Sequence, residues 1–243
     1  MLSGALPAIA SEPSPSIADL PTVEVPAAAD RGVFAVHLTG DGGYDATDKG
    51  LAQGLASRGV PVVALNTRKY FGTERTPDAA AEDLARILRH YLGQWHARQF
   101  VAIGYSFGAN VMPYLVTRLP QDLRARIRSI ALLAPTADAE FKVTLAERLG
   151  LSTSSRYPVV PELERLRGTR MLCFYGEHDG ETIGSQIDPT LVTRCPIPGG
   201  HDIGKRSQLI VEKILETVRE GPPSAPVEER PEKTTRTGTS SGT

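Results

Sequence analysis

The stretch that decides the fold is Gln99-Phe-Val-Ala-Ile-Gly-Tyr-Ser-Phe-Gly-Ala-Asn110. Its first half is apolar and β-branched, which predicts a short buried strand, and a helical pattern follows Ser106. Between them stands Gly104-Tyr-Ser-Phe-Gly108, a G-x-S-x-G pattern in the strand–turn–helix context of a nucleophile elbow. Glycines are needed there because side chains would collide as strand and helix close on each other. A glycine-flanked strand end in another α/β domain is the alternative interpretation.

Predicted strands and helices alternate on both sides of this stretch. Strands are predicted at 22–25, 33–38, 60–65, 129–134, 170–175 and 191–195. Helices are predicted at 45–57, 77–95 and 203–219, the second with Thr76 as its N-cap. The alternation predicts an α/β fold with a mostly parallel sheet of about six to seven strands and helices on both faces. In such sheets ligands bind outside the carboxyl ends of the strands.

The length of 243 residues suits one domain of moderate size. Residues 1–21 are interpreted either as a flexible leader or as the remnant of a signal peptide, because Ala8-Ile-Ala10 resembles a cleavage site without a basic segment before it. Residues 22–219 are predicted to form the domain, and 220–243 a disordered tail. Residues 136–168 are interpreted as an insertion over the sheet, a candidate lid, with short helices near 138–149 and 161–167.

Several function classes find no support in the composition. The net charge of −1 and the absence of a basic run argue against a nucleic-acid partner. No apolar run approaches the roughly 18 residues of a membrane span. No His/Cys cluster has metal-ligand spacing, and the sequence predicts neither a metal nor another cofactor. Cys173 and Cys195 lie on neighbouring predicted strands; we favour two buried thiols, and the sequence leaves a disulfide open.

A nucleophilic serine needs a base within hydrogen-bond reach. His201, in Pro198-Gly-Gly-His-Asp202, follows the last predicted strand, where the chain order Ser…Asp/Glu…His of α/β-hydrolases places the base. His37 lies inside a predicted strand and is interpreted as a core histidine. The predicted acid that orients the base is Asp179, because it follows the strand that ends at Tyr175.

Other carboxylates remain candidates for the acid, first Asp138 and more weakly Glu177 and Asp202. An oxyanion needs two preorganised N–H donors. We expect one from the backbone of Phe107, directly after the serine. The second is expected from Asp41 in the loop Thr39-Gly-Asp-Gly-Gly43, with Gly40 as the alternative.

These residues together resemble the bacterial virulence protein VirJ/AcvB family of the α/β-hydrolase superfamily. The resemblance covers residues 20–219 and rests on five motifs: His37-Leu-Thr-Gly-Asp-Gly-Gly43, Leu65-Asn-Thr-Arg-Lys-Tyr-Phe71 with Arg75-Thr-Pro77, Gly104-Tyr-Ser-Phe-Gly-Ala109, Pro135-Thr-Ala-Asp138 and Pro198-Gly-Gly-His201. It implies an α/β-hydrolase fold with Ser106 as nucleophile and His201 as base. Asn110 stands where the family pattern leads us to expect Asp.

The resemblance also implies a function. Its members are described as periplasmic hydrolases of lysyl-phosphatidylglycerol, linked to type IV secretion. We therefore expect an exported or periplasmic serine esterase that acts on the aminoacyl ester of a phospholipid headgroup, with a cytoplasmic location as the alternative. Because a lysyl ester is cationic, Asp45, Glu140 and Glu181 are candidates for binding it. The rival hypotheses are a non-catalytic binding protein that docks to secretion-system or envelope proteins, and an acyltransferase with the same triad.

Overall fold

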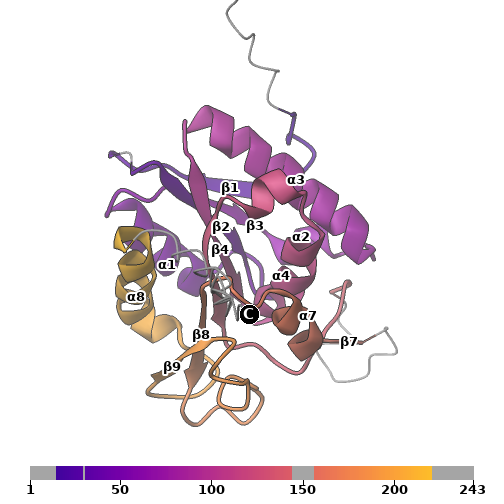
Figure 1. The fold of residues 1–243 in the computed structure, drawn as a ribbon, viewed down its shortest axis with the longest axis vertical. Helices are drawn as coiled ribbons and strands as arrows, with labels where there is room; N and C mark the ends of the chain where they lie inside the picture. The colour runs from indigo at the N-terminus through magenta and orange to yellow at the C-terminus, as the bar shows by residue number, and fades with distance from the viewer. Residues whose placement is uncertain (1–14, 30, 144–155, 221–243) are drawn as a thin grey trace, which may run out of the picture.

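The computed structural model describes residues 15–29, 31–143 and 156–220. Within these ranges seven strands form one sheet, in the order β1-β3-β2-β4-β5-β8-β9 (Figure 1). Strand β1 is antiparallel to β3, and every other neighbouring pair is parallel. The strands are β1 (Thr22–Val25), β2 (Val33–Leu38), β3 (Val62–Leu65), β4 (Gln99–Tyr105), β5 (Ile127–Leu133), β8 (Met171–Gly176) and β9 (Thr193–Ile197). The predicted α/β class and the predicted edge strand are confirmed.

Helices cover both faces of the sheet, so its central strands are buried on both sides. Figure 1 shows α1 (Ala46–Ala56) and α8 (Ser207–Arg219) on one face, with α3 (Pro77–Gln94), α4 (Phe107–Arg118) and α7 (Val159–Arg165) on the other. Each layer has its own apolar core against the sheet. Two short helices, α2 (Thr67–Tyr70) and α5 (Gln121–Arg124), lie in connecting segments, and a 3₁₀ turn, η1 (Gly204–Arg206), precedes α8.

The helix starts follow the capping chemistry of the sequence. Asp45 caps α1 by accepting hydrogen bonds from the N–H groups of Thr47 and Asp48, and Asp48 completes a capping box. Thr76 accepts from the N–H of Ala79, and Pro77 occupies the first helical turn, as predicted. These local interactions hold the N-terminus of α1 at the carboxyl edge of the sheet, directly after the loop that follows β2.

The insertion differs from its prediction. Asp138–Ala139 forms the short strand β6, which pairs antiparallel with Tyr157–Pro158, strand β7. The start of the helix predicted at 138–149 is therefore wrong: Ala139 is buried against the core in an extended conformation, and no apolar stripe favours a helix there. Most of the rest of that helix lies outside the described residues. Helix α7 begins at Val159, two positions before the predicted start at 161.

The packed region extends before residue 22. Ile17 and Leu20 are buried in the same core as α3, and Arg86 on α3 forms an ion pair with Asp19. Part of the predicted leader therefore belongs to the folded domain. The predictions for residues 1–14 and 221–243 lie outside the described residues.

The two cysteines are free thiols on opposite faces of the sheet. Cys195 is paired in register with Phe174, so it is offset by one residue from Cys173. Side chains alternate between the faces of a strand, and Cys173 packs in the α3 layer whereas Cys195 packs in the α8 layer. A disulfide between them is therefore excluded in this fold, in agreement with the favoured prediction of two thiols.

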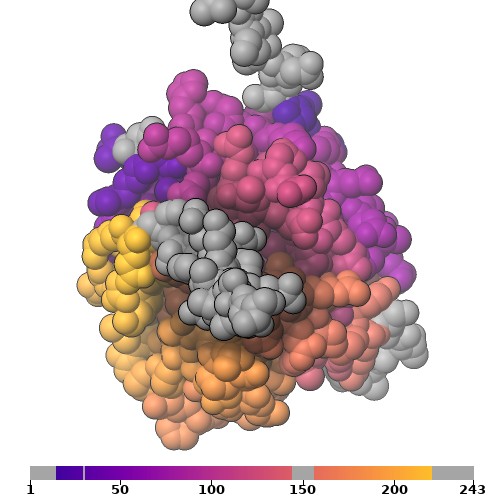
Figure 2. Space-filling view, in the orientation of Figure 1, coloured from indigo at the N-terminus to yellow at the C-terminus, as the bar shows by residue number. Residues whose placement is uncertain are grey.

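The helices in the described ranges include none that is long and apolar enough to cross a membrane. Figure 2 shows one face of the molecule in space-filling form, with α8 in yellow along one side and the segments around β8 and β9 in orange beside it. The segments that carry the chemistry predicted from sequence follow β2, β4, β5, β8 and β9, so they meet at the carboxyl edge of the sheet.

Candidate active site

Ser106 stands at a sharp turn between β4 and α4. Its φ of 49° is unusual for a residue with a side chain, and its backbone N–H donates to the carbonyl oxygen of Leu133, 2.8 Å away. A Cβ atom on Gly104 would lie 2.3 Å from the carbonyl oxygen of Gly108, and one on Gly108 would lie 2.2 Å from that of Leu38. The close approach of strand and helix that explains the G-x-S-x-G pattern is therefore present.

A chain of two hydrogen bonds joins three residues predicted as catalytic. The hydroxyl of Ser106 lies 3.0 Å from His201 Nε2, and His201 Nδ1 lies 2.9 Å from Asp179 Oδ2. In this arrangement the imidazole accepts from the serine hydroxyl and donates to the carboxylate. The three residues come from the turns after β4, β8 and β9, which are brought together because those strands are parallel in one sheet.

The environment of Asp179 suits an orienting carboxylate. Its side chain is only 2% exposed, whereas that of His201 is 33% exposed and open to a ligand. The second oxygen of Asp179, Oδ1, accepts from the N–H of Glu181 at 3.0 Å. A Cβ atom on Gly176 would lie 2.1 Å from the carbonyl oxygen of Gly200, so the turns that carry the acid and the base are in close contact.

The other candidate acids lie elsewhere. Asp138, on β6, lines the pocket beside Ser106, but its carboxylate makes no hydrogen bond to His201 in the described structure. Glu177 and Asp202 are exposed, and Asp202 accepts from the N–H of Gly204. Among these carboxylates the structure places Asp179 alone against the imidazole.

The loop after β2 forms the other wall of the site. A Cβ atom on Gly40 would lie 3.8 Å from the Ser106 Cβ, so this loop passes close to the serine. Thr67 anchors the loop: its hydroxyl donates to the carbonyl oxygen of Gly40 at 2.6 Å, and its N–H donates to Thr39 Oγ1 at 3.0 Å. Asp41, from this loop, lines the same pocket as Ser106, His201 and Phe107. The two predicted oxyanion residues are therefore neighbours of the serine.

The pocket above Ser106 has a volume of about 210 Å³ and carboxylate-rich walls. Those carboxylates belong to Asp41, Asp138, Glu140 and Glu181. The largely exposed Arg156 forms an ion pair with Glu140 at 3.5 Å. Of the three carboxylates predicted to bind a cation, Glu140 and Glu181 line the pocket, whereas Asp45 caps α1 instead.

Asn110 and Thr136 form part of the pocket floor and bind each other. The side-chain amide of Asn110 donates to Thr136 Oγ1 at 2.7 Å and accepts from the Thr136 N–H at 2.8 Å. The motif Pro135-Thr-Ala-Asp138 thus contributes to the pocket through Thr136 as well as Asp138. The role of Thr136 was not predicted from the sequence, although the motif stands directly after the predicted strand.

His37 proves to be a buried residue with a carboxylate partner. It is fully buried on β2, and its Nε2 donates to Asp48 Oδ1 on α1 over 2.6 Å. A core histidine was predicted from the sequence, but its partner Asp48, eleven positions away, was not.

Tyr105, beside the serine, lies 6.4 Å from the His201 ring, centroid to centroid, and burial raises the pKa of its hydroxyl to about 12. Tyr105 is therefore neutral at physiological pH.

Solved structures with a similar fold are enzymes of several kinds. MenH from S. aureus is 14% identical with a TM-score of 0.61, covering 82% of this chain and 98% of that one. Est1E from Butyrivibrio proteoclasticus is 11% identical with a TM-score of 0.61, covering 84% and 97%. An alpha-beta serine hydrolase homologue from Coxiella burnetii is 16% identical with a TM-score of 0.54, covering 80% and 89%. At such identities these matches show the fold alone, which is the predicted α/β-hydrolase fold.

Sequence comparison adds a family. The profile of a family described as "Bacterial virulence protein (VirJ)" matches residues 32–221. That range contains the serine, the histidine and the aspartate of the hydrogen-bonded chain, and all four pocket carboxylates. No curated protein sequence matches this chain significantly.

Proposed function

Since the chain belongs to the VirJ family of bacterial virulence proteins, we propose that it is a serine hydrolase that cleaves the aminoacyl ester of an aminoacylated phospholipid. Lysyl-phosphatidylglycerol is the substrate that the family resemblance implies. The observation that carries the hydrolase proposal is the hydrogen-bonded chain from Ser106 through His201 to the buried Asp179. Nucleophile, base and orienting acid are the parts that acyl transfer to water requires.

In the proposed reaction the Ser106 hydroxyl attacks the ester carbonyl carbon while its proton moves to His201 Nε2. The Asp179 carboxylate, bonded to Nδ1–H, stabilises the imidazolium that forms. The carbonyl oxygen becomes an oxyanion, which the N–H groups of Phe107 and Asp41 stabilise. The C–O bond to the alcohol then breaks, and the imidazolium gives its proton to the departing headgroup oxygen.

Water completes the cycle. It attacks the acyl-enzyme carbonyl and loses a proton to His201, and Ser106 leaves as the protonated hydroxyl. The products are the free amino acid and the phospholipid with its hydroxyl restored. The exposed face of His201, with its side chain 33% exposed, supports access of both the alcohol and the water.

The pocket carboxylates support a cationic acyl group. An α-amino group and a lysine side chain each carry a positive charge near neutral pH. Four carboxylates around a hollow of about 210 Å³ would stabilise such an acyl group and disfavour a fatty acyl chain. Asp138, Glu140 and Glu181 are the residues we assign to this recognition, with Asp41 serving the oxyanion through its backbone.

The decisive experiment combines active-site labelling with turnover. Purified protein should react with a fluorophosphonate probe and release amino acid from lysyl-phosphatidylglycerol, and Ser106→Ala should do neither. Ser57→Ala, a serine on the opposite edge of the sheet, is the matched control and should behave as wild type. Wild-type protein that labels but hydrolyses only neutral esters would reject the proposed substrate, and equal labelling of wild type and Ser106→Ala would reject the nucleophile.

The rival binding-protein hypothesis makes a different prediction in cells. A docking role for secretion-system or envelope proteins would survive Ser106→Ala, whereas a hydrolase role would not.

We further propose an exported, periplasmic location, supported by the signal-like sequence at Ala8-Ile-Ala10 and by the family. Fractionation of cells that express the full-length protein tests this, and recovery from the cytoplasm alone would contradict it.

A further inference from the structure

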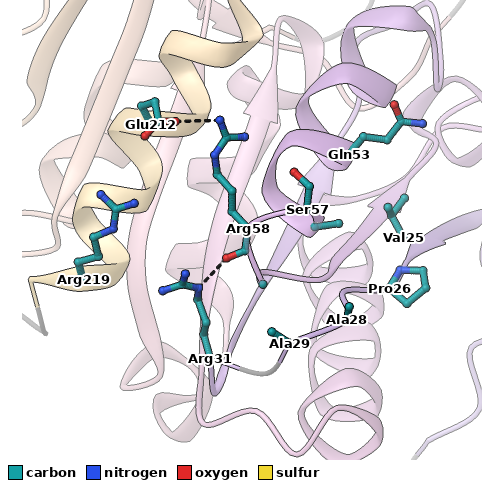
Figure 3. Close-up of a pocket in the computed structure, with 12 residues that line it drawn as sticks. Val25, Pro26, Ala28, Ala29, Arg31, Gln53, Ser57, Arg58, Glu212 and Arg219 are labelled. Atoms are coloured by element: carbon teal, nitrogen blue, oxygen red, sulfur yellow. Dashed lines mark hydrogen bonds and ion pairs between the residues drawn. The ribbon is translucent and has the colours of Figure 1, made fainter.

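A second pocket lies at the opposite, amino-terminal edge of the sheet. It is bounded by the end of β1 at Val25, the segment before β2, the end of α1, and α8, and its volume is about 560 Å³ (Figure 3). Ser106 and His201 stand at the carboxyl edge, so a ligand in this second pocket is remote from the proposed reaction. The proposed function leaves the pocket unexplained.

Among the described residues, three arginines line this pocket with one carboxylate. Figure 3 shows Arg219 on α8, and Arg31 and Arg58 beside each other, with Arg58 directed toward Glu212. Arg58 forms an ion pair with Glu212 at 2.9 Å and also donates to the carbonyl oxygen of Gly54 at 3.1 Å. Its guanidinium is thereby held in place at the pocket wall.

The other two guanidinium groups, those of Arg31 and Arg219, are not paired with a described carboxylate. Arg31 uses its Nε to donate to the carbonyl oxygen of Arg58 at 2.6 Å, and its terminal nitrogens make no ion pair with any described residue. Arg219 makes no ion pair within the described ranges either. The described lining residues, three cations and one anion, therefore carry a formal excess of two positive charges.

The shape of the pocket is fixed by backbone geometry at its base. Gly59 has a φ of 84°, and a Cβ atom there would lie 3.0 Å from Arg31 Nε, so the arginine side chain packs directly on the glycine. Gln53 and Ser57 add polar groups to the wall, and Pro26 and Ala28 add an apolar side. The pocket thus combines fixed cationic donors with room for a small organic group.

Further arginines stand along the same amino-terminal edge of the sheet. An arginine stands within four residues before each of five parallel strands: Arg31, Arg58, Arg98, Arg126 and Arg170. Because parallel strands start at the same edge, these side chains collect along one border of the sheet. Arg58 pairs with Glu212 and Arg170 with Glu220, so part of this positive charge is neutralised at the edge, and the remainder attracts anionic ligands.

We propose that this pocket binds a phosphate-bearing ligand through Arg31, Arg58 and Arg219. The guanidinium fork matches two phosphate oxygens at once, which a doubly charged phosphate monoester can satisfy from two arginines. The pocket's position away from the catalytic edge makes it a binding site separate from that of the ester substrate. The phosphate belongs to a soluble organic phosphate or to a lipid headgroup, and the two sources are separable by experiment.

Calorimetric titration with sn-glycerol 3-phosphate tests the soluble source, and flotation with vesicles that contain phosphatidic acid, a lipid phosphate monoester, tests the lipid source. We expect the double variant Arg31→Gln/Arg219→Gln to lower the association constant for the probe that binds by at least about tenfold. The matched control is Arg124→Gln, an exposed arginine of α5 that precedes β5 and does not line the pocket. It should bind as wild type does.

The readout needs no turnover, so it remains valid even if the ester hydrolase proposal fails. Circular dichroism and thermal unfolding establish that the variants are folded. No binding of either probe by wild type would overturn the proposal. Equal losses in Arg124→Gln and in the double variant would also overturn it, because diffuse charge along the edge, rather than the pocket, would then attract the phosphate.

Discussion

At the scale of single residues, the site depends on a strained serine. A positive φ at a residue with a side chain costs about 1–3 kcal/mol, and Ser106 holds it because β4, α4 and the N–H bond to Leu133 fix its position. The strain exposes the hydroxyl to His201. Asp179 bonds to the imidazole and Asp138 only lines the pocket, so single substitutions distinguish their roles.

Asp179→Asn is expected to lower kcat for a neutral ester by roughly 10⁴-fold, because an amide cannot hold the imidazole tautomer or stabilise imidazolium. Asp138→Asn should leave that kcat within about threefold of wild type, because Asp138 lines the pocket without bonding to His201. Steady-state kinetics on a soluble neutral ester measure both. A reversed order of effects would reassign the acid to Asp138.

Glu181→Gln is expected to raise KM for a lysyl ester by about fivefold and to leave a hexanoyl ester, which has no amino group, almost unchanged. The reason is that the lost carboxylate stabilises the cationic acyl group only, and one partly screened charge pair is worth about 1 kcal/mol. Glu177→Gln, an exposed neighbour outside the pocket, is the control. Equal changes for both esters would remove Glu181 from charge recognition.

The two thiols are expected to differ in their reactivity toward alkylating reagents. Burial raises the pKa of the Cys173 thiol to about 12, and burial also raises the pKa of Cys195. Because the thiolate is the reactive form, native protein at pH 8 should react with iodoacetamide slowly at Cys195 and not measurably at Cys173. Peptide mass spectrometry after timed labelling distinguishes the two sites. Both should react once the protein is unfolded, and rapid native labelling of Cys173 would contradict the packing of β8.

At the scale of elements, the N-terminus of α1 connects the core to the catalytic loop. Asp48 accepts from His37 Nε2 through one oxygen and from the Asp45 N–H at 3.0 Å through the other. The buried Asp48 carboxylate therefore binds both sides of the loop that carries Asp41: His37 on β2 before it and Asp45 after it. The His37–Asp48 pair and the hydrogen bond from the Thr67 hydroxyl to Gly40 both hold this loop in position.

Asp48→Ala is expected to lower the free energy of unfolding by about 3 kcal/mol or more, because it leaves a fully buried histidine without its partner and removes half of the capping box. Urea denaturation followed by circular dichroism gives the value. Lys49→Ala, exposed on the same helix, is the control and should change stability by less than about 0.5 kcal/mol. A similar loss in both variants would contradict the role assigned to the buried pair, because alanine has the higher helix propensity at both positions.

At the scale of the whole molecule, carboxylates surround the catalytic serine at one edge of the sheet, and arginines, two of them paired with Glu212 and Glu220, stand at the other. The carboxyl edge surrounds Ser106 with four carboxylates, and an arginine precedes each of five strands at the amino edge. The net charge of −1 conceals this separation. A polarised molecule attracts a cationic substrate toward its catalytic edge over distances that depend on salt.

Raising the ionic strength from about 0.01 to about 0.15 M shortens the screening length from about 30 to about 8 Å. We expect kcat/KM for a lysyl ester to fall several-fold over this range, because long-range attraction to the carboxylates is screened. The hexanoyl ester, which has no amino group and is compared in the same buffers, should show little change. A salt effect of equal size on both esters would indicate that salt acts on the protein itself and not on attraction of the substrate.

Much of this architecture was predictable because its causes are local. The bounds of β2 and the caps of α1 and α3 follow from residues that are neighbours in sequence. The start of the insertion was not predictable in the same way. Its strand β6 depends on pairing with β7, nearly twenty positions later, and no local pattern encodes that partner.

The sequence by itself determined the elbow around Ser106, the order of serine, acid and base, and the alternation that makes a parallel sheet, because each arises from sterics and periodicity within a few residues. Only the tertiary structure decided that Asp179 meets His201, that the two thiols face apart, and that carboxylates and arginines gather at opposite edges. These outcomes depend on strand register and on contacts such as that between Ser106 and His201, 95 residues apart, which packing of the whole sheet fixes.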